Sequence, residues 1–500
     1  MKRTIIALLL ATAVFAPSIA SAAWITDIRS SAYDKDDPFD MALDINYELG
    51  QKNTWILREY FNQSGNIEMI NALKFTEWNH MMRLNLAIGV YKDLELTLQL
   101  PITISQQATL GFHPGIPGGA EYQTLQQINV DASAKSYGSD SAANKAGTLF
   151  DMPGNGWQGP ARSGVGDFGI GFRWSPIHNT RHHHYPSWVL GFLFRIPTAA
   201  VRKADNTAVG EGMFQVEMNT AISRRVTRHF EPYFDLHGKL KVATGKSLFD
   251  IPDGGDQTMS YTQPGNELGL KLGAEFKAWE VAAEEKYFAF DVGAGLDFVF
   301  RGREYSELFE ILGASPCSPV DGCGLTSYYR EVAALQNGYE ETYKDALAQA
   351  ESDHPDKNSN DYKQAASAAK GVYDEKRAAL AAGTAADAKK VSRSDGITDV
   401  EQYGVYSFWL GFSLQPVKYF ALGARFMGQV VHPHFLTFAD AGKDLDGDGN
   451  VEYKYSTGSN SGGPNEYNPK YIEEIDKIGH RFQAGAVFNW SLMFTISGKY

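Results

Sequence analysis

One stretch of the sequence has carboxylates at the spacing of a metal-binding loop. Three Asp residues at alternate positions precede Gly449, which suits the sharp turn of such a loop. Oxygen ligands in this order favour a hard cation such as Ca²⁺, although Tyr455 stands where an EF-hand has its bidentate Glu. We therefore expect weak Ca²⁺ binding, as in extracellular DxDxDG loops, with a solvated acidic turn as the alternative. The candidate ligands are Asp444, Asp446, Asp448, Asn450 and Glu452.

Cysteine and histidine residues offer two other kinds of chemistry. Cys317 and Cys323 enclose five residues, and in an exported protein such a pair favours a local disulfide; a free or metal-binding pair is the alternative. The histidine run at 182–184 could capture a metal ion, but a polar turn between strands explains it more simply. No spacing matches the catalytic residues of outer-membrane phospholipases or proteases. We therefore expect that the protein is not an enzyme.

These residues lie between segments that have the alternation of β-strands. In the stretch 83–103, large aliphatic residues occupy every second position on both sides of Tyr91-Lys92-Asp93. Alternation at period two predicts strands, and a one-residue change of register would exchange the two faces. A three-residue loop at 91–93 would pair Val90 with Leu94 and place all the aliphatic side chains on one face.

The same alternation recurs through the rest of the chain. It covers the segments 164–174, 188–196, 214–223, 230–240, 268–278, 288–301, 406–414 and 420–430. In nearly all of them one face is apolar and the other carries charges of both signs, which predicts a barrel wall with lipid outside and a polar lumen inside. The candidate lumen-lining residues are Asp167, Arg173, Arg195, Glu217, Lys239, Lys271, Asp297, Arg301 and Arg425.

Both ends of the sequence point to export and insertion into an outer membrane. Residues 1–22 have a basic start, a short apolar region and an Ala-Ser-Ala cleavage site, which predicts a signal peptide. The segment from Phe482 to Tyr500 alternates as one long strand and ends on an aromatic residue. Such an ending looks like the signal for the barrel-assembly machinery of Gram-negative bacteria. We therefore expect residues 23–500 to form an outer-membrane β-barrel with both ends in the periplasm.

The number of strands depends on the region before residue 80. The segment 41–47 alternates, whereas 55–60 does not, so this region supplies one strand and a loop or three strands. Periplasmic ends require an even count, and we expect a transmembrane antiparallel all-β barrel of 12 strands, with 14 as the alternative.

Two long insertions fall on the extracellular side of this barrel. Residues 303–400 form one loop, in which 327–391 has the three-and-four spacing of an Ala-rich α-helical hairpin. This hairpin either binds a partner or caps the barrel mouth. The second loop, residues 436–476, contains the acidic Ca²⁺-like motif.

The segments LNLAIGVYKDLELTLQLPI and GVGDFGIGFRW resemble the outer-membrane barrels of the meta-pathway phenol-degradation-like family. This resemblance implies a transporter in the Gram-negative outer membrane, with aromatic or other hydrophobic small molecules as cargo. We expect a passive channel or transporter for small molecules; the alternative is an anchor whose surface loops bind a partner or a cell surface. Expected partners are outer-membrane lipid and the barrel-assembly machinery. The net charge of −13 argues against nucleic acid.

Overall fold

The computed structural model describes most of the barrel and the helical insertion. The described residues are 23, 25–28, 30, 40–61, 66–113, 157–179, 185–204, 206–244, 264–281, 284–314, 325–381, 396–443, 468, 471 and 473–500. The predicted signal peptide, the two cysteines, the histidine run at 182–184 and the acidic motif at 444–452 lie outside them.

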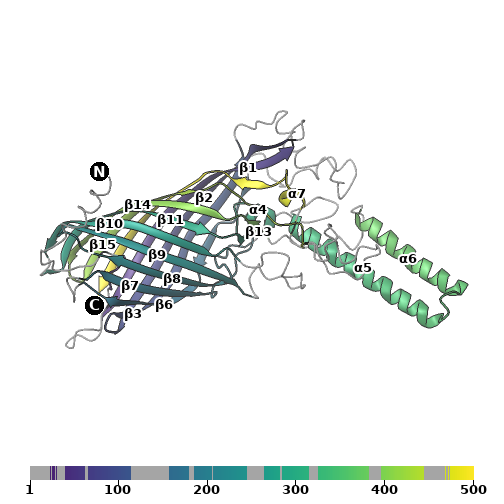
Figure 1. The fold of residues 1–500 in the computed structure, drawn as a ribbon, viewed down its shortest axis with the longest axis horizontal. Coiled ribbons are helices and arrows are strands. Elements are labelled where there is room, and N and C mark those ends of the chain that lie inside the picture. Colours follow the sequence, from purple (N-terminus) through teal and green to yellow (C-terminus); the bar gives the residue numbers. More distant parts are fainter. Residues whose placement is uncertain are drawn as a thin grey trace, which may run out of the picture.

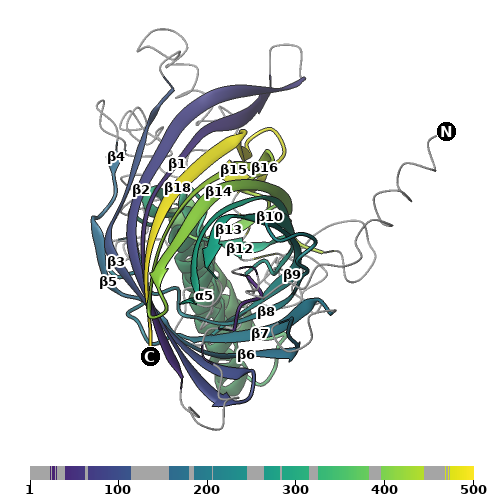
Figure 2. The same ribbon diagram turned by 90° about the vertical axis from the view of Figure 1, so that its left-hand side faces the viewer.

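Twelve strands form a closed antiparallel barrel (Figures 1 and 2). The ring closes because the last strand, 487–499, pairs on one side with the first strand, 41–61, and on the other side with the strand 420–431. The strands of the ring are β1 (Met41–Phe61), β2 (Ile67–Tyr91), β3 (Leu94–Phe112), β6 (Phe168–Ile177), β7 (Ser187–Ile196), β8 (Met213–Ser223), β9 (Phe230–Ala243), β10 (Glu267–Val281), β11 (Lys286–Val299), β14 (Tyr403–Val417), β15 (Phe420–Val431) and β18 (Val487–Lys499). The prediction of a 12-stranded barrel is confirmed.

The outer wall of the barrel is apolar because of the alternation in each strand. In β14, Tyr406, Phe408 and Leu410 are 46–59% exposed, whereas Trp409 between them faces the interior and is 6% exposed. Comparable rows of exposed Leu, Phe and Val side chains run along β10, β11 and β18. Such an apolar belt fits the hydrocarbon of a bilayer. Because the sheet is closed, no strand edge is left unpaired there. The protein is therefore an outer-membrane barrel of the Gram-negative type, as predicted. Within the described residues, no helix is long and apolar enough to cross a membrane.

The hairpin between β2 and β3 has one error in its predicted register. Leu86 pairs with Leu98, as predicted, but Leu94 pairs with Tyr91 rather than with Val90. The register shifts between Gly89 and Tyr91, because Val90 is an extra residue in β2. A two-residue turn with Lys92 at φ 47° then replaces the expected three-residue loop.

The region before residue 80 forms β1 and the first half of β2. β1 keeps its parity here, with Thr54, Ile56 and Arg58 facing inward, and the pattern of apolar and polar residues is lost because Ile56 packs into the apolar cluster at the mouth. The pairing shifts between Ile56 and Leu57 because Ala72 is an extra residue in β2, and this bulge reverses the faces of β2 without ending the strand. The sequence pattern was therefore interrupted inside one continuous strand.

The C-terminal segment is two strands, and the prediction of one long strand is wrong. β17 (Phe482–Ala484) and β18 both pair with β1, but they are separated at Gly485 and Ala486. Across these two residues the parity changes, so that even-numbered side chains face the interior in β17 and odd-numbered side chains face it in β18. Phe482 is consequently buried inside the barrel mouth, whereas Phe488 is exposed on the outer wall.

The helical insertion is a hairpin of α5 (Leu325–Asp353) and α6 (Asn360–Ala381). The rings of Tyr343 and Tyr373 stack between the two helices with their centroids 5.1 Å apart. Figure 1 shows the hairpin projecting from the end of the barrel opposite the C-terminus. The predicted helical hairpin is confirmed, and since the long loops of such barrels are extracellular, we place it on that side.

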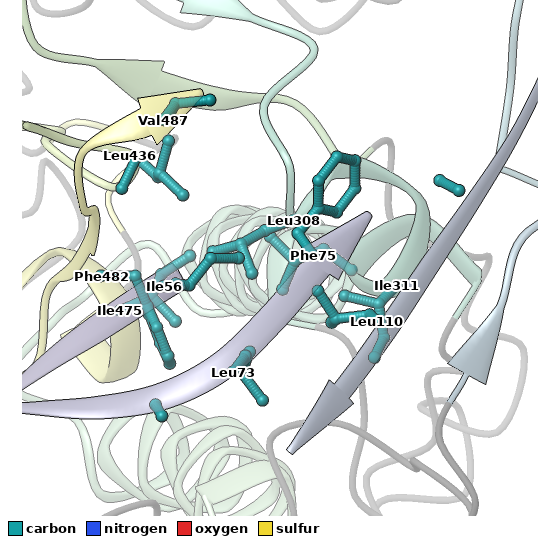
Figure 3. Close-up of a cluster of buried hydrophobic side chains, with 14 of the residues drawn as sticks. Ile56, Leu73, Phe75, Leu110, Leu308, Ile311, Leu436, Ile475, Phe482 and Val487 are labelled. Carbon is teal, nitrogen blue, oxygen red and sulfur yellow. The ribbon is translucent and has the colours of Figure 1, made fainter. Parts of the chain in front are cut away.

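Short elements fill the extracellular end of the barrel. They are β12 (Gly302–Glu304), α4 (Phe309–Ala314), β13 (Thr398–Val400), β16 (His434–Phe435) and α7 (Glu473–Asp476). β4 (Trp157–Gln158) and β5 (Arg162–Val165) extend the wall beside β3. The largest cluster of buried apolar side chains lies here, at the mouth, and not at the centre of the barrel (Figure 3).

Candidate functional site: a lumen closed at its mouth

The barrel encloses a series of adjoining cavities. A cavity of about 450 Å³ lies beneath the mouth, and Glu217, Lys239 and Glu267 line both it and a second cavity of about 610 Å³. A third cavity, of about 460 Å³, shares Arg173 and Lys271 with the second. Because neighbouring cavities share their walls, they form a chain along the lumen.

The structure places eight of the nine sequence-predicted lumen residues on the walls of these cavities. Arg301 differs, because it follows the end of β11. Its guanidinium donates to the carbonyl of Phe438 at 2.7 Å and to the carboxylate of Asp440 at 2.8 Å, so it lies at the rim. The residues on cavity walls are Asp167, Arg173, Arg195, Glu217, Lys239, Lys271, Asp297 and Arg425.

Ion pairs between neighbouring strands neutralise much of this charge. Arg195 pairs with Glu217 at 2.7 Å, and Lys239 pairs with Glu267 at 3.1 Å. The other two pairs, Arg173 with Glu95 at 2.9 Å and Arg425 with Asp291 at 2.7 Å, also join residues of the barrel wall. The sequence pattern showed which residues face inward, but the choice of partner depends on strand order.

A histidine between two carboxylates lies at the centre of the lumen. His237 approaches Asp235 at 2.9 Å through Nδ1 and Asp297 at 2.6 Å through Nε2. Lys271 lines the same cavities and has no carboxylate within 4.0 Å among the described residues. The lumen therefore presents charges of both signs to any solute that enters it.

The described residues between 23 and 30 lie inside the barrel at its periplasmic end. The backbone N–H of Ala23 donates to Glu231 at 2.7 Å, and Arg173 donates to the carbonyl of Ile25 at 3.1 Å. The hydroxyls of Thr26 and Ser223 are 2.6 Å apart. Since this stretch is not a strand, the alternation pattern held no signal for its position, and sequence reasoning missed it.

The extracellular mouth is covered by residues 302–314, which we call the mouth segment. Three of its carboxylates are bound by cations from different parts of the wall. The pairs are Glu304 with Lys241 of β9 at 3.2 Å, Glu307 with Lys52 of β1 at 2.8 Å, and Glu310 with both Arg162 of β5 at 2.8 Å and Arg202 at 3.0 Å. The mouth segment is therefore attached on several sides of the lumen.

Apolar contacts also hold the mouth segment. Leu308, Ile311 and Leu312 are buried against a cluster of aliphatic and aromatic side chains from β1, β2 and β3 (Figure 3). Burying side chains of this size stabilises the closed arrangement by about 1.5–3 kcal/mol each. The apolar contacts and the ion pairs act together at one end of the channel.

A buried ion pair joins the mouth segment to the end of the helical insertion. Arg303 in β12 donates to Asp399 in β13 at 3.0 Å, and both side chains are 1% exposed. Arg303 also donates to the carbonyl of Ile397 at 2.7 Å. The two strands pair outside the barrel sheet, so this contact stabilises the mouth and not the wall.

The two carboxyl groups nearest the cavity differ in acidity. Burial raises the pKa of Glu307, but the charges of Lys52 and His434 and the hydrogen bond from Lys52 together outweigh burial and hold this pKa below its usual range. Burial is also the largest influence on Glu304, and Lys241 offsets it only in part, so the pKa of Glu304 lies above its usual range. Protonation of Glu304 therefore favours the closed arrangement, whereas protonation of Glu307 opposes it.

Sequence reasoning missed the mouth segment, although it included these residues in the extracellular insertion 303–400. A signal was present, because Glu304, Glu307 and Glu310 recur at every third position around the apolar residues Leu308 and Phe309. Nothing in the sequence identified the four cations that bind them. The helical hairpin, which was the candidate cap, projects outward instead.

Comparisons with known proteins give no family assignment. No family model matches the chain, and no curated protein matches it. Among solved structures, an outer membrane channel from Pseudomonas putida F1 is 10% identical and aligns over 93% of this chain and 99% of that chain, with a TM-score of 0.38. A Pseudomonas aeruginosa FadL homologue is 8% identical (93% and 90%, TM-score 0.28), and the TodX monoaromatic hydrocarbon channel is 6% identical (92% and 90%, TM-score 0.28). The fold assignment rests on the strand pairing, and the resemblance to the meta-pathway family stays a prediction.

Proposed function

We propose that the barrel is a gated outer-membrane transporter for small molecules, with the mouth segment as the extracellular gate. The observation that carries this proposal is the chain of cavities, which runs from the N-terminal stretch at one end to the underside of the mouth segment at the other. A barrel that served only as an anchor would gain stability from a filled interior, because empty space loses packing contacts.

The mouth segment is suited to act as a gate. Glu304, Tyr305, Glu307 and Glu310 form part of the wall of the outermost cavity. Displacement of this segment would therefore open that cavity to the exterior. Lid movements of this kind require that the contacts of the lid separate without disturbing the scaffold. The contacts of the mouth segment meet this condition, because its side chains touch the wall but its backbone pairing, β12 with β13, lies outside the twelve-stranded ring.

The lining of the cavities favours polar or amphiphilic cargo. Charges of both signs face every cavity, and such groups are better solvated by polar solutes than by hydrocarbon. The third cavity also contains Tyr233, Trp409 and Met427, which offer an apolar surface for a ring or a short chain. The hydrophobic or aromatic cargo implied by the family resemblance stays a prediction, and this cavity is where it would be accommodated.

A second candidate function is favoured by the helical hairpin. α5 and α6 extend beyond the barrel mouth (Figure 1), which is a suitable position for a partner-binding element. In this alternative the barrel is an anchor, and the ion pairs in the lumen serve its stability. The predicted Ca²⁺ loop and the predicted disulfide fall in the two insertions that the sequence places on the extracellular side, and their structure lies outside the described residues.

Single-channel recording in a planar bilayer distinguishes these functions. In a Cys317→Ser/Cys323→Ser background, the cysteines of Lys52→Cys/Glu307→Cys would be joined by a short cross-linker that forms a reducible disulfide with each thiol. We expect the cross-link to abolish channel openings and a reductant to restore them. Each single-cysteine variant treated with the same reagent is the matched control.

A loosened gate provides the complementary test. Leu308→Ala/Leu312→Ala removes apolar contacts that are worth about 2–5 kcal/mol per side chain, so openings should become frequent. Heat-modifiable gel mobility establishes that each variant is folded. Absence of conductance in folded Leu308→Ala/Leu312→Ala protein would refute the transporter and leave the anchor.

A further inference from the structure

We propose that the outer vestibule of this channel binds anionic groups, carboxylates or phosphates of the cargo, on cations that the mouth segment now neutralises. This inference rests on the proposed function and adds the chemical class of the cargo. In this view Glu307 and Glu310 occupy the places of the anionic groups that they exclude. The site lies on the barrel wall, and the mouth segment is its internal occupant.

The pairing of the vestibule cations supports this assignment. Among the described residues, Lys52, Arg162 and Arg202 have no carboxylate within 4.0 Å except those of the mouth segment. The pattern differs for Arg195, which lines the same outermost cavity, and for Arg173, which lines the cavities farther in, because both pair with carboxylates of the wall itself. Withdrawal of the mouth segment therefore leaves these wall pairs intact and leaves three cations at the entrance with no carboxylate within 4.0 Å among the described residues.

Uncompensated cations in this position favour anions. Leaving a partly buried charge without its partner is costly, and an arriving carboxylate or phosphate removes this cost by restoring charge-assisted hydrogen bonds. A neutral or cationic solute restores none of them. The vestibule should therefore admit anions in preference to cations once the mouth segment is displaced.

The three cations have different roles. The side chain of Lys52 is 36% exposed and that of Arg202 is 17% exposed, so both can reach a solute in the cavity that they line. The Arg202 guanidinium also lies over the rings of Tyr305 and Phe309, at 5.6 and 5.5 Å, and this face becomes free when the segment leaves. Lys52 and Arg202 are therefore the proposed ligand-binding residues.

Arg162 is instead a positioning residue. It is buried and donates to the backbone carbonyls of Lys203, Asn206 and Ala208. These bonds fix the loop that carries Arg202. Because substitution of Arg162 would disturb that loop, the test below leaves it unchanged.

The experiment measures ion selectivity of the full-length mature protein in a planar bilayer under a KCl gradient. Glu307→Gln/Glu310→Gln removes the carboxylates that pair with these cations, with little change of shape. We expect this variant to open more often than the unmodified protein and its reversal potential to shift toward the chloride equilibrium potential. Adding Lys52→Gln/Arg202→Gln should abolish the shift, and heat-modifiable gel mobility establishes that this variant is folded.

Glu77→Gln is the matched control for the charge change. Glu77 lines the same cavity and forms no ion pair with the wall or the mouth segment among the described residues. If Glu77→Gln shifted the reversal potential as much as removal of any one mouth-segment carboxylate, the effect would be one of overall charge, and the proposed site would be wrong.

A second arm begins with the unmodified protein, so that its first result does not depend on the folding of a variant. Citrate or inorganic phosphate, compared with acetate and chloride at equal ionic strength, should raise the open probability, and Lys52→Gln/Arg202→Gln should remove this response. Conductance without any anion preference or citrate response would overturn the inference while preserving the transporter. Folded protein that never conducts, in any variant, would overturn the transporter itself.

Discussion

The buried pair of Arg303 and Asp399 gives the most decisive prediction about the gate. Arg303→Met removes the cation and leaves a carboxylate that is 1% exposed without its ion partner. Such a loss costs about 3–5 kcal/mol, which corresponds to roughly a 10²–10⁴-fold change in an equilibrium constant. Because β12 and β13 lie outside the ring, this cost should fall on the mouth segment and not on the barrel.

Hydrogen exchange measured by mass spectrometry can locate that cost. In Arg303→Met, peptides from 302–314 and 396–400 should exchange faster by about the factor given above, whereas peptides from β10 and β11 should be unchanged. Openings in the bilayer should become more frequent in parallel. The heat-modifiable fraction should remain that of the unmodified protein.

The double variant Arg303→Met/Asp399→Leu is the control. Replacing both partners with apolar side chains of similar size removes the unpaired charge and should restore most of the protection. Faster exchange throughout the barrel, or a double variant as open as the single one, would refute the reasoning, because the pair would then not be what holds the gate.

Three further predictions follow from other contacts. The raised pKa of Glu304 means that it binds a proton more readily when the gate is closed, so acidification toward pH 4.5 should favour closure. The lowered pKa of Glu307 means the reverse, so further acidification below pH 4.5 should favour opening. Channel recordings should therefore show the lowest open probability near pH 4.5. Gly293→Ala should lower the heat-modifiable fraction, because its Cβ would lie 2.2 Å from the Trp409 ring, whereas Gly111→Ala, which meets no atom within 4 Å, should not. Deletion of α5 and α6 should leave both folding and conductance intact if the hairpin is a partner-binding element, and loss of conductance would instead tie it to the gate.

The sequence was sufficient for the barrel because alternation is a local property. Each strand reports its own two faces, and the row of exposed side chains in β14 could be read from residues 406–412 alone. The errors arose where extra residues reverse the pattern, at Val90 and at Gly485, and where Ile56 turns an apolar side chain into the cluster at the mouth. A bulge keeps the hydrogen-bonded ladder but changes parity, so periodicity alone cannot distinguish it from the end of a strand.

The gate was beyond sequence reasoning for a different reason. Glu307 and Lys52 are far apart in the chain, and their contact depends on which strands close the barrel and on how the insertion folds back into it. Inward charges could be recognised from parity, but the partner of each charge could not. The division between wall-paired and gate-paired cations, which carries the proposed anion selectivity, therefore exists only in the three-dimensional structure.

Energetics explain why the opening signal should be a multivalent anion. A ligand that shifts a two-state gate from mostly closed to mostly open must favour the open state by about 5.5 kcal/mol. One hydrogen bond to a charged group contributes only about 1.5–3 kcal/mol, whereas simultaneous contacts with Lys52 and Arg202 reach about 3–6 kcal/mol. Acetate or chloride can replace one contact, but citrate can replace both. The apolar contacts of Leu308 and Leu312 then set the threshold that keeps weaker ligands from opening the channel.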